Sequence, residues 1–309
     1  MSSRKTVRIL VLILCMMFCA GSVGAEVVIE EDAVINRIDV KPEEMDTFSF
    51  ADDAKLLEIW FPNIRDADAA VLIYDGEVWM IDCGDERAAL RTAAMLRQLG
   101  IHKIDKLFIS HPHHDHLNGL EITDDTAKIQ EMLISFPEDS TEHMIRAMEN
   151  CRLRGITVSH YKDGDTWFMG DGAVSLTFWQ LDDPQLSMND RSAICMLRYK
   201  GRSMLFTADL ENRGQRAFLA RMGEDAFRAD IFKYPHHGKI GLVDEFFYAI
   251  GAQMAIVTNS RGTRDGTKYL MYKHIDHAFT NRQDYYVHLL TDGEHWVCEN
   301  APILPDTNQ

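Results

Sequence analysis

The chain has 309 residues, 48 of them acidic against 32 basic, and a formal net charge of −16 at neutral pH. A surface of that sign repels polyanions at long range, so duplex nucleic acid is disfavoured as a partner unless a local basic groove exists. The length suits one large α/β domain or two small ones.

The first 25 residues have the layout of a secretory signal peptide. Arg4, Lys5 and Arg8 precede the apolar run ILVLILCMMFCA, and small residues follow up to Ala25. We expect cleavage after Ala25 and export to the cell envelope or medium. An uncleaved N-terminal anchor is the alternative, although the run is short for a membrane span. The mature chain would hold about 284 residues with a net charge of −19 and no transmembrane segment, because the leader removes three basic and no acidic residues.

Residues 26–54 are acidic and weakly patterned, and we expect an N-terminal arm or an extra strand there. Residues 55–309 then form the main domain. Four cysteines remain after cleavage, and none lies in the short CxxC spacing of a metal site. Free buried thiols and disulfide bridges both remain open for Cys83, Cys151, Cys195 and Cys298.

The first half of the domain begins with strands at 57–60, 69–74 and 77–84, the last two joined by a turn at Asp75-Gly76. Residues 85–101 predict a helix that ends near Gly100, and a strand follows at 103–110. We expect one apolar stripe on that helix, formed by Leu90, Ala93, Ala94 and Leu96. A second helix at 140–155 leads to a strand at 156–161.

The second half is rich in strands. Two hairpins are predicted, at 166–181 around Asp171-Gly172 and at 193–210 around Lys200-Gly201. Helices at 211–223 and 242–251 alternate with strands at 229–235 and 253–260, and a hairpin at 285–300 ends the pattern. Two strand-rich halves that each gain helices predict an α/β protein in which two packed sheets are flanked by helices. This is a four-layer αββα sandwich with a site along one edge.

A dense histidine cluster, HPHHDH at 111–116, directly follows one of the predicted strands. Imidazole and carboxylate groups suit Zn²⁺ or Mn²⁺. Residues two apart in an extended turn project to the same side, so His111 and His113 can grip one ion while Asp115 and His116 face a second. Two ions about 3.5–4 Å apart form the usual binuclear hydrolytic centre.

Three more polar groups stand at strand ends. Asp209 ends an apolar strand and could bridge both ions, or could cap the helix that follows. One of His236 and His237 could complete the second ion's shell, while the other donates a proton or steadies an anionic oxygen. Asp82 could brace the histidine loop from behind, or could be a plain turn residue.

These segments resemble the metallo-β-lactamase superfamily. HPHHDH matches its signature, and IDCG at 81–84 and TAD at 207–209 are similar to its strand ends. HHGK at 236–239 and NDRS at 189–192 make the chain most similar to the branch that contains the hydrolase domain of ComEC-type competence proteins and the phosphorylcholine esterases. The resemblance covers residues 55–298 and implies the αββα fold.

The resemblance also implies roles for the site residues. It assigns His111 and His113 to metal one, Asp115 and His116 to metal two, and Asp209 to a position between them. His237 would be the last ligand of metal two, and His236 the acid or oxyanion contact. Two departures concern the remaining positions: Asn189 stands where many members supply a third histidine to metal one, and Lys239 replaces a serine and could pair with a substrate phosphate.

We therefore expect a secreted, binuclear, metal-dependent hydrolase in which zinc or manganese activates a water molecule, Asp115 orients it and His236 assists the developing charge. From the branch, the expected substrate is a phosphodiester or a phosphocholine-like small molecule. One alternative is a ComEC-like extracellular nuclease with a basic groove formed by Lys233, Lys239, Arg261, Arg264 and Lys268. The other is a non-catalytic metal-binding protein on the same fold, favoured by the missing metal-one ligand.

Overall fold

The computed structural model describes residues 49–260, 269–270, 272–281 and 284–304. All of them belong to the unit that spans residues 34–309. The signal peptide and most of the predicted arm lie outside the described residues, and so do Arg261, Arg264 and Lys268.

Among the described residues, eight strands form a first sheet in the order β17-β16-β1-β2-β3-β5-β7-β8. Strands β3, β5, β7 and β8 run parallel, and the other neighbours pair antiparallel. The β2–β3 turn places both Asp75 and Gly76 at positive φ, as two-residue hairpin turns require. The strand bounds are β1 Leu57–Phe61, β2 Ala69–Tyr74, β3 Glu77–Cys83, β5 Lys106–Phe108, β7 Glu131–Ile134, β8 Thr157–His160, β16 Tyr285–Thr291 and β17 Trp296–Pro302.

A second sheet has seven strands among the described residues, in the order β15-β14-β13-β12-β11-β10-β9. Strands β12 to β15 run parallel, and β9 to β12 pair antiparallel. The strand bounds are β9 Thr166–Met169, β10 Val174–Trp179, β11 Ile194–Tyr199, β12 Arg202–Phe206, β13 Ile231–Lys233, β14 Met254–Val257 and β15 Asp276–Phe279.

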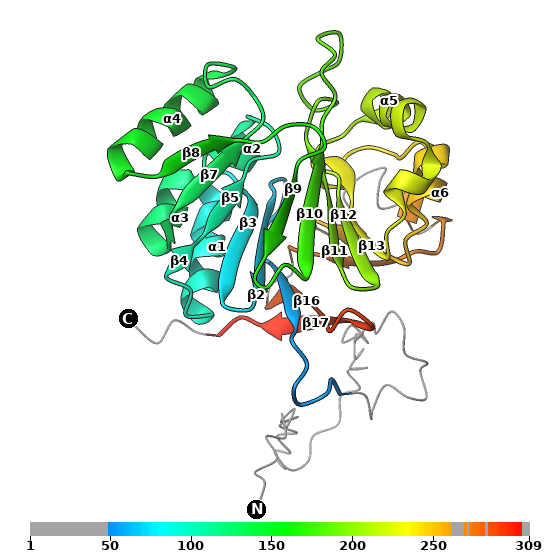
Figure 1. Ribbon diagram of the computed structural model, residues 1–309, viewed down its shortest axis with the longest axis horizontal. Coiled ribbons are helices and arrows are strands. Elements are labelled where there is room, and N and C mark those ends of the chain that lie inside the picture. The colour runs from blue at the N-terminus through cyan, green and yellow to red at the C-terminus, as the bar shows by residue number, and fades with distance from the viewer. Residues whose placement is uncertain (1–48, 261–268, 271, 282–283, 305–309) are drawn as a thin grey trace, which may run out of the picture. The chain divides into compact units, whose positions relative to one another are not determined.

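The two sheets pack face to face through one apolar core that draws residues from both, including Trp79 and Phe108 from the first sheet and Phe178 and Phe206 from the second. Helices α1 (Glu86–Gln98), α3 (Leu120–Thr126) and α4 (Glu142–Arg154) cover the outer face of the first sheet. Helices α5 (Asn212–Met222) and α6 (Asp244–Ile250) cover the second (Figure 1). The predicted α/β class and four-layer αββα sandwich are confirmed.

The predicted stripe on α1 is wrong at Leu90, which is 61% exposed. The N-cap of α1 is Asp85, whose side chain accepts a hydrogen bond from the Ala88 amide. The buried face of the helix starts at Ala88 and recurs with the helical period. Leu90 is about 200° around the helix from Ala88 and therefore faces solvent. The buried residues of α1 are Ala88, Ala89, Thr92, Ala93, Met95 and Leu96.

The strand expected at 103–110 is divided in two at Asp105. This residue exchanges hydrogen bonds with the Val78 backbone, its amide donating to the Val78 carbonyl and its carboxylate accepting from the Val78 amide. The first piece, β4 (Lys103–Ile104), therefore pairs with β6 (Lys128–Ile129) in a small separate sheet, and only β5 enters the main sheet. Elements that the sequence pattern did not predict are α2 (His114–Leu117), α3, β6, β7, β15, and the 3-10 turns η2 (Glu224–Phe227) and η3 (Pro235–Gly238).

None of the helices among the described residues combines the length and apolar character needed to cross a bilayer. Cys83, Cys151, Cys195 and Cys298 are all buried free thiols. Burial raises the pKa of the Cys298 thiol to about 12, so these thiols are inert packing groups rather than nucleophiles.

Candidate metal centre

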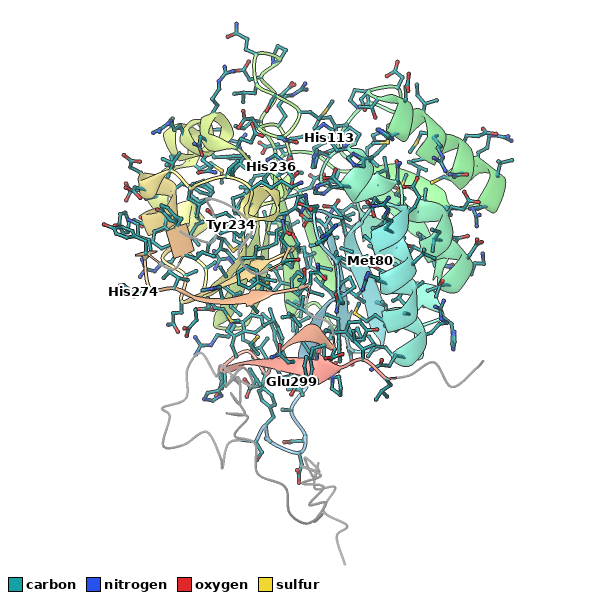
Figure 2. All side chains as sticks on the ribbon, turned by 180° about the vertical axis from the view of Figure 1, so that it is seen from behind. Met80, His113, Tyr234, His236, His274 and Glu299 are labelled. Carbon is teal, nitrogen blue, oxygen red and sulfur yellow. The ribbon has the colours of Figure 1, made fainter. Side chains whose placement is uncertain are left out.

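The polar groups singled out in the sequence converge where strands of the two sheets end. Asp82 lies in β3, the histidine cluster follows β5, Asp209 follows β12, and His236 and His237 follow β13. His113 and His236, from different halves of the chain, lie at one end of the described unit, and Glu299 lies at the other (Figure 2).

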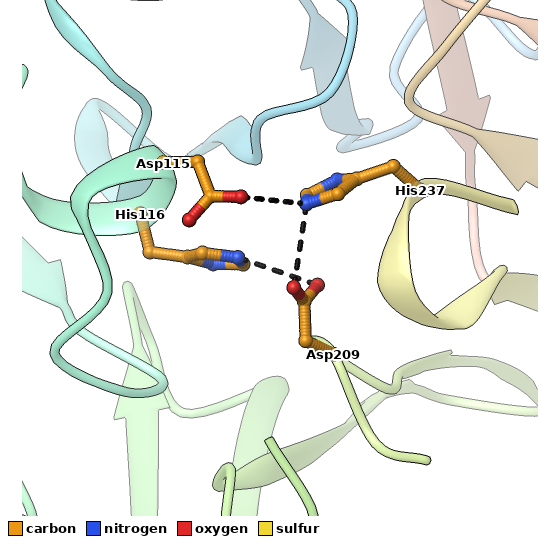
Figure 3. A group of neighbouring side chains, drawn as sticks. All are labelled: Asp115, His116, Asp209 and His237. Atoms are coloured by element: carbon orange, nitrogen blue, oxygen red, sulfur yellow. Dashed lines mark ion pairs between the residues drawn. The ribbon is translucent and has the colours of Figure 1, made fainter. Parts of the chain in front are cut away.

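Four side chains form a compact donor group: Asp115, His116, Asp209 and His237. All four are buried, and one ligand atom from each lies within 4.8 Å of the others. His116 Nε2 is 3.3 Å from Asp209 Oδ1. His237 Nε2 is 3.3 Å from Asp115 Oδ2 and 3.4 Å from Asp209 Oδ2 (Figure 3).

Three atoms of this group are buried without a hydrogen-bond partner: His116 Nε2, His237 Nε2 and Asp209 Oδ1. Buried polar atoms are nearly always satisfied, so three orphaned atoms in one small volume call for a missing partner. Two imidazole nitrogens and two carboxylates match the ligands that zinc and related divalent ions take in proteins. The residues therefore fit a metal ion.

His116 is held from behind by Asp82. Its Nδ1 lies 2.7 Å from Asp82 Oδ2, and the same carboxylate accepts hydrogen bonds from the Ser110 amide at 2.8 Å and the Ser110 hydroxyl at 2.7 Å. This arrangement directs His116 Nε2 toward Asp209, as carboxylate–histidine pairs do behind metal ligands. The structure thus places Asp82 against His116, in the bracing position rather than as a plain turn residue.

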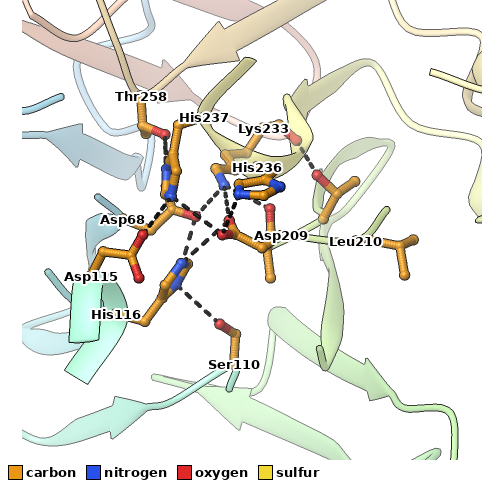
Figure 4. A network of polar contacts seen from close by, with 12 residues as sticks. Asp68, Ser110, Asp115, His116, Asp209, Leu210, Lys233, His236, His237 and Thr258 are labelled. Carbon is orange, nitrogen blue, oxygen red and sulfur yellow. Dashed lines mark hydrogen bonds and ion pairs between the residues drawn. The ribbon is translucent and has the colours of Figure 1, made fainter. Parts of the chain in front are cut away.

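His237 is held in the same way by two residues that sequence reasoning missed. Its Nδ1 is 3.0 Å from Asp68 Oδ1 and 3.0 Å from Thr258 Oγ1, and the Thr258 hydroxyl donates to Asp68 at 2.6 Å. Lys233 pairs with the other oxygen of Asp68 (Figure 4). Its ammonium also donates to the Ala208 carbonyl at 2.8 Å. The sequence signal for Asp68 and Lys233 is a charge at the end of an apolar strand, since Asp68 directly precedes β2 and Lys233 is the last residue of β13.

Opposite charges sustain this buried network. Burial alone would raise the pKa of Asp209, but His237 and His116 hold that pKa well below its usual range. Burial likewise opposes charge on His237, yet Asp209 and Asp68 raise its pKa to about 10. The buried carboxylates are therefore stable as anions only with positive charge beside them. A divalent ion bound by neutral imidazoles would supply that charge and would compete with protons for the imidazole nitrogens.

His111 and His113 form a second, smaller set. His111 Nε2 lies 3.0 Å from His113 Nδ1, so the two lone pairs can meet at one ion. Burial lowers the pKa of both imidazoles, which keeps them neutral and able to bind metal. Among the residues that the structure describes, neither belongs to a group of three or more metal-type donors.

His236 lies on the rim of the centre, with its side chain 21% exposed. Its Nε2 is 3.7 Å from Asp209 Oδ2 and its Nδ1 is 3.2 Å from Glu211 Oε1. Asn189 donates to the same Glu211 oxygen at 3.0 Å. Glu211, another residue missed in the sequence, thus links the two predicted residues.

The basic groove suggested for a nuclease is not formed at Lys233, since this lysine is buried in its ion pair with Asp68. Lys239 faces Asp66, with 3.4 Å between Nζ and Oδ1. The other three positions of that groove lie outside the described residues.

The backbone is strained at the points that deliver these groups. His236, His237, Asp82 and Ala208 all adopt positive φ, between 46° and 57°. Side chains other than glycine rarely take this conformation, and such strain gathers at functional sites. For His236 and His237 it turns two adjacent imidazoles toward Asp209 from one short turn, η3.

Comparisons with known proteins match parts of the chain. A family model described as Anti-Pycsar protein Apyc1 matches residues 66–165, which include Asp68, Asp82 and the histidine cluster. ComE operon protein 3 from Bacillus subtilis (strain 168) is 26% identical over 171 residues, 53% of this chain and 21% of that protein. Zinc phosphodiesterase ELAC protein 1 from Homo sapiens is 45% identical over 56 residues, 18% of this chain and 15% of that protein. The chain thus matches about a fifth or less of the length of these relatives.

Solved structures include similar chains at low identity. The metallo-β-lactamase fold protein YhfI from Bacillus subtilis aligns with a TM-score of 0.48 and 10% identity, covering 72% of this chain and 95% of that chain. A metallo-β-lactamase from Cronobacter sakazakii aligns with a TM-score of 0.41 and 18% identity, covering 56% of this chain and 75% of that chain. The fold described above rests on the strand order and the core of this chain itself.

Proposed function

We propose that this protein is a metal-dependent hydrolase of phosphodiesters that acts at the centre formed by Asp115, His116, Asp209 and His237. The observation that carries the proposal is the buried donor group with three orphaned ligand atoms. A relative named as a zinc phosphodiesterase supports metal-dependent hydrolase activity and this substrate class.

The residues divide the work by position. Asp115, His116, Asp209 and His237 would hold one ion, and His111 with His113 would hold a second beside Asp209. Bound zinc or manganese would lower the pKa of a coordinated water and neutralise charge on a phosphoryl oxygen.

Two further side chains would act on the reactants. Asp115 directs one oxygen at His237, and its carboxylate can also accept a hydrogen bond from the attacking water and so orient it. His236 stands on the rim, between Asp209 and Glu211, where it can donate a hydrogen bond to an anionic oxygen of the substrate. Lys239, half-buried beside Asp66, is the candidate partner of a substrate phosphate.

Within this class we favour a small phosphodiester or phosphocholine-like molecule over DNA or RNA. The net charge of −16 opposes a polyanion, and the ion pair of Lys233 with Asp68 removes one cation from the groove that a nuclease would need. The relative named ComE operon protein 3 keeps a nuclease as the second candidate. Steep loss of single-stranded DNA cleavage with added salt would favour it.

The decisive test is hydrolysis of bis-p-nitrophenyl phosphate by protein loaded with Mn²⁺ or Zn²⁺. We expect Asp209→Asn to lower kcat by about 100-fold or more, since it removes a carboxylate from the group that would hold the ions. His160→Ala, an exposed histidine on β8, is the matched control and should leave the rate unchanged. Turnover of lactones or amides without any turnover of phosphodiesters would overturn the substrate class. No turnover of any substrate despite bound metal would favour a non-catalytic metal-binding protein.

We also propose that the protein is exported after cleavage behind Ala25, as the leader composition supports. Mass spectrometry of protein recovered from the envelope and medium of expressing cells should then find Glu26 as the first residue. Full-length chains confined to the cell interior would contradict export.

A further inference from the structure

We infer that the two metal positions are unequal: one ion is resident, held by Asp115, His116, Asp209 and His237, and a second ion at His111 and His113 is weakly held and exchangeable. This inference rests on the proposed function only in taking the centre to be metal-dependent. It concerns which residues hold metal, not which substrate is cleaved.

The resident position is built to hold its ion. All four ligands are buried, and the two imidazoles are fixed from behind by Asp82 and by Asp68 with Thr258. Such partners behind a metal ligand fix its ring orientation and its tautomer. Losing one typically weakens metal binding by about 10- to 100-fold, and we expect a difference of this size between the two metal positions.

The second position lacks this construction. Ser110 uses its single hydroxyl proton on Asp82, so toward His111 Nδ1, 3.1 Å away, it can only accept. That contact places the proton on His111 Nδ1 and leaves Nε2 free for metal, but a neutral hydroxyl replaces the carboxylate that stands behind each resident imidazole. His113 is half-buried, so water competes for it.

Among the described residues, no histidine, cysteine or carboxylate forms a compact donor group of three with His111 and His113. Protein zinc sites use at least three ligands drawn from histidine, cysteine and carboxylates, and His111 with His113 supply two. Asn189 donates from its nitrogen to Glu211 and leaves its buried Oδ1 without a hydrogen-bond partner, but a neutral carboxamide oxygen is a poorer zinc ligand than histidine, cysteine or carboxylate. The Glu211 carboxylate is in turn shared between Asn189 and His236. Asp209 is the carboxylate left to share among these described residues, and it already belongs to the resident donor group.

The test is metal binding without substrate. Metal-stripped mature protein is titrated with ZnCl₂ by calorimetry, and metal content is measured after gel filtration in metal-free buffer. We expect one ion per chain to survive filtration, and a second binding phase weaker on the order of 100-fold.

Three matched histidine variants assign the two phases. His116→Ala should lose the retained ion. His113→Ala should keep the retained ion and lose the weak phase. His114→Ala, an exposed neighbour with its side chain 60% exposed, should keep both. If His116→Ala fails to fold by circular dichroism, Asp115→Asn removes a ligand from the same position, and the two affinities of the unaltered protein test the inference without any variant.

Two ions retained with equal affinity would overturn the inference, and so would loss of the retained ion in His113→Ala. Failure of the proposed function looks different. One retained ion together with no hydrolysis of any phosphodiester at saturating zinc or manganese would support unequal positions and refute the activity.

Discussion

At the scale of single residues, the charge of Lys233 neutralises a buried carboxylate behind the metal centre. Its ammonium is buried against Asp68, which in turn orients His237. A buried carboxylate that loses its partner keeps its desolvation cost and loses the compensating attraction.

We therefore expect Lys233→Met to lower the free energy of unfolding by about 3–5 kcal/mol, measured by urea denaturation. Lys239→Met is the matched control, because its contact with Asp66 is longer and partly exposed, and it should cost about 1 kcal/mol or less. Equal losses in the two variants would contradict the role given to Lys233.

A second residue-scale prediction concerns Ala208, held at a φ of 46° beside Asp209. Both Ala208 and Ala89 of α1 are buried, so changing either to glycine removes a buried methyl group, which costs about 0.8 kcal/mol. Glycine relieves the positive φ at position 208, whereas at position 89 it also weakens the helix. We therefore expect Ala208→Gly to be more stable than Ala89→Gly by roughly 1–2 kcal/mol in thermal unfolding, and equal losses in the two variants would show that the backbone at Ala208 is not strained.

At the scale of elements, a histidine joins three neighbouring strands at the edge of the first sheet. His288 in β16 lies 3.0 Å from Glu58 of β1 and 2.8 Å from Glu299 of β17, and its ring stacks on Trp60 at 3.6 Å. Burial alone would lower the pKa of His288, but the two glutamates raise it. His288 in turn lowers the pKa of Glu58.

The sign of the resulting pH dependence follows from these two directions. A raised histidine pKa stabilises the fold fully below about 6.5, its unfolded value, and that contribution is lost as pH rises through the folded pKa. A lowered glutamate pKa stabilises the fold above about pH 4.3, and that contribution is lost as pH falls through the folded pKa.

We expect His288→Gln to lower the free energy of unfolding by about 1 kcal/mol near pH 6, since both glutamates are partly exposed and screened, and by less near pH 9. Urea denaturation at both pH values checks this, and a cost that grows toward pH 9 would refute it. The exposed His102, changed to Gln, should show no such trend.

Many of the secondary-structure elements could be predicted from the sequence. The hairpins were predictable because alternating apolar residues flank turns such as Asp75-Gly76. The short strand β7 (EMLI) was not, since a few apolar residues in a row fit either state. Helix α3 (LEITDDT) was not, since its two apolar residues are too few to show a helical period. The helix face of α1 was misassigned because Leu90 is apolar yet has no layer above it.

The candidate site, too, could be predicted from the sequence only in part. HPHHDH gathers five potential donors within six residues, so the local sequence reveals this part of the site. Thr258 and Glu211 carry no local signal, and the charge that marks Asp68 does not name its partner, because only the packing of the two sheets brings these residues beside the histidines. Asp82 was ambiguous for the same reason until Ser110 and His116 could be seen against it.

At the scale of the whole molecule, metal binding should stabilise the fold, since the donor group exists only in the folded chain. An ion at about 100 times its Kd adds about 2.7 kcal/mol, which is worth several degrees in Tm. We expect zinc to raise the Tm of the unaltered protein and a chelator to reverse the rise, as followed by calorimetry. Asp209→Asn should lose the shift while His160→Ala keeps it, and an equal shift in both would show that zinc binds elsewhere.

The hydrogen bond from Thr258 to Asp68 joins residues 190 positions apart, and His237 depends on both of them. A chain emerging from the ribosome completes the second sheet long after the histidine loop has been made. Early capture of a stray ion by that loop would therefore be loose, and firm retention would mark a finished polypeptide. Metal content could thus serve as a quality measure for preparations, since proteolytic nicks or truncations that separate the two halves should release the ion well before they abolish helical structure.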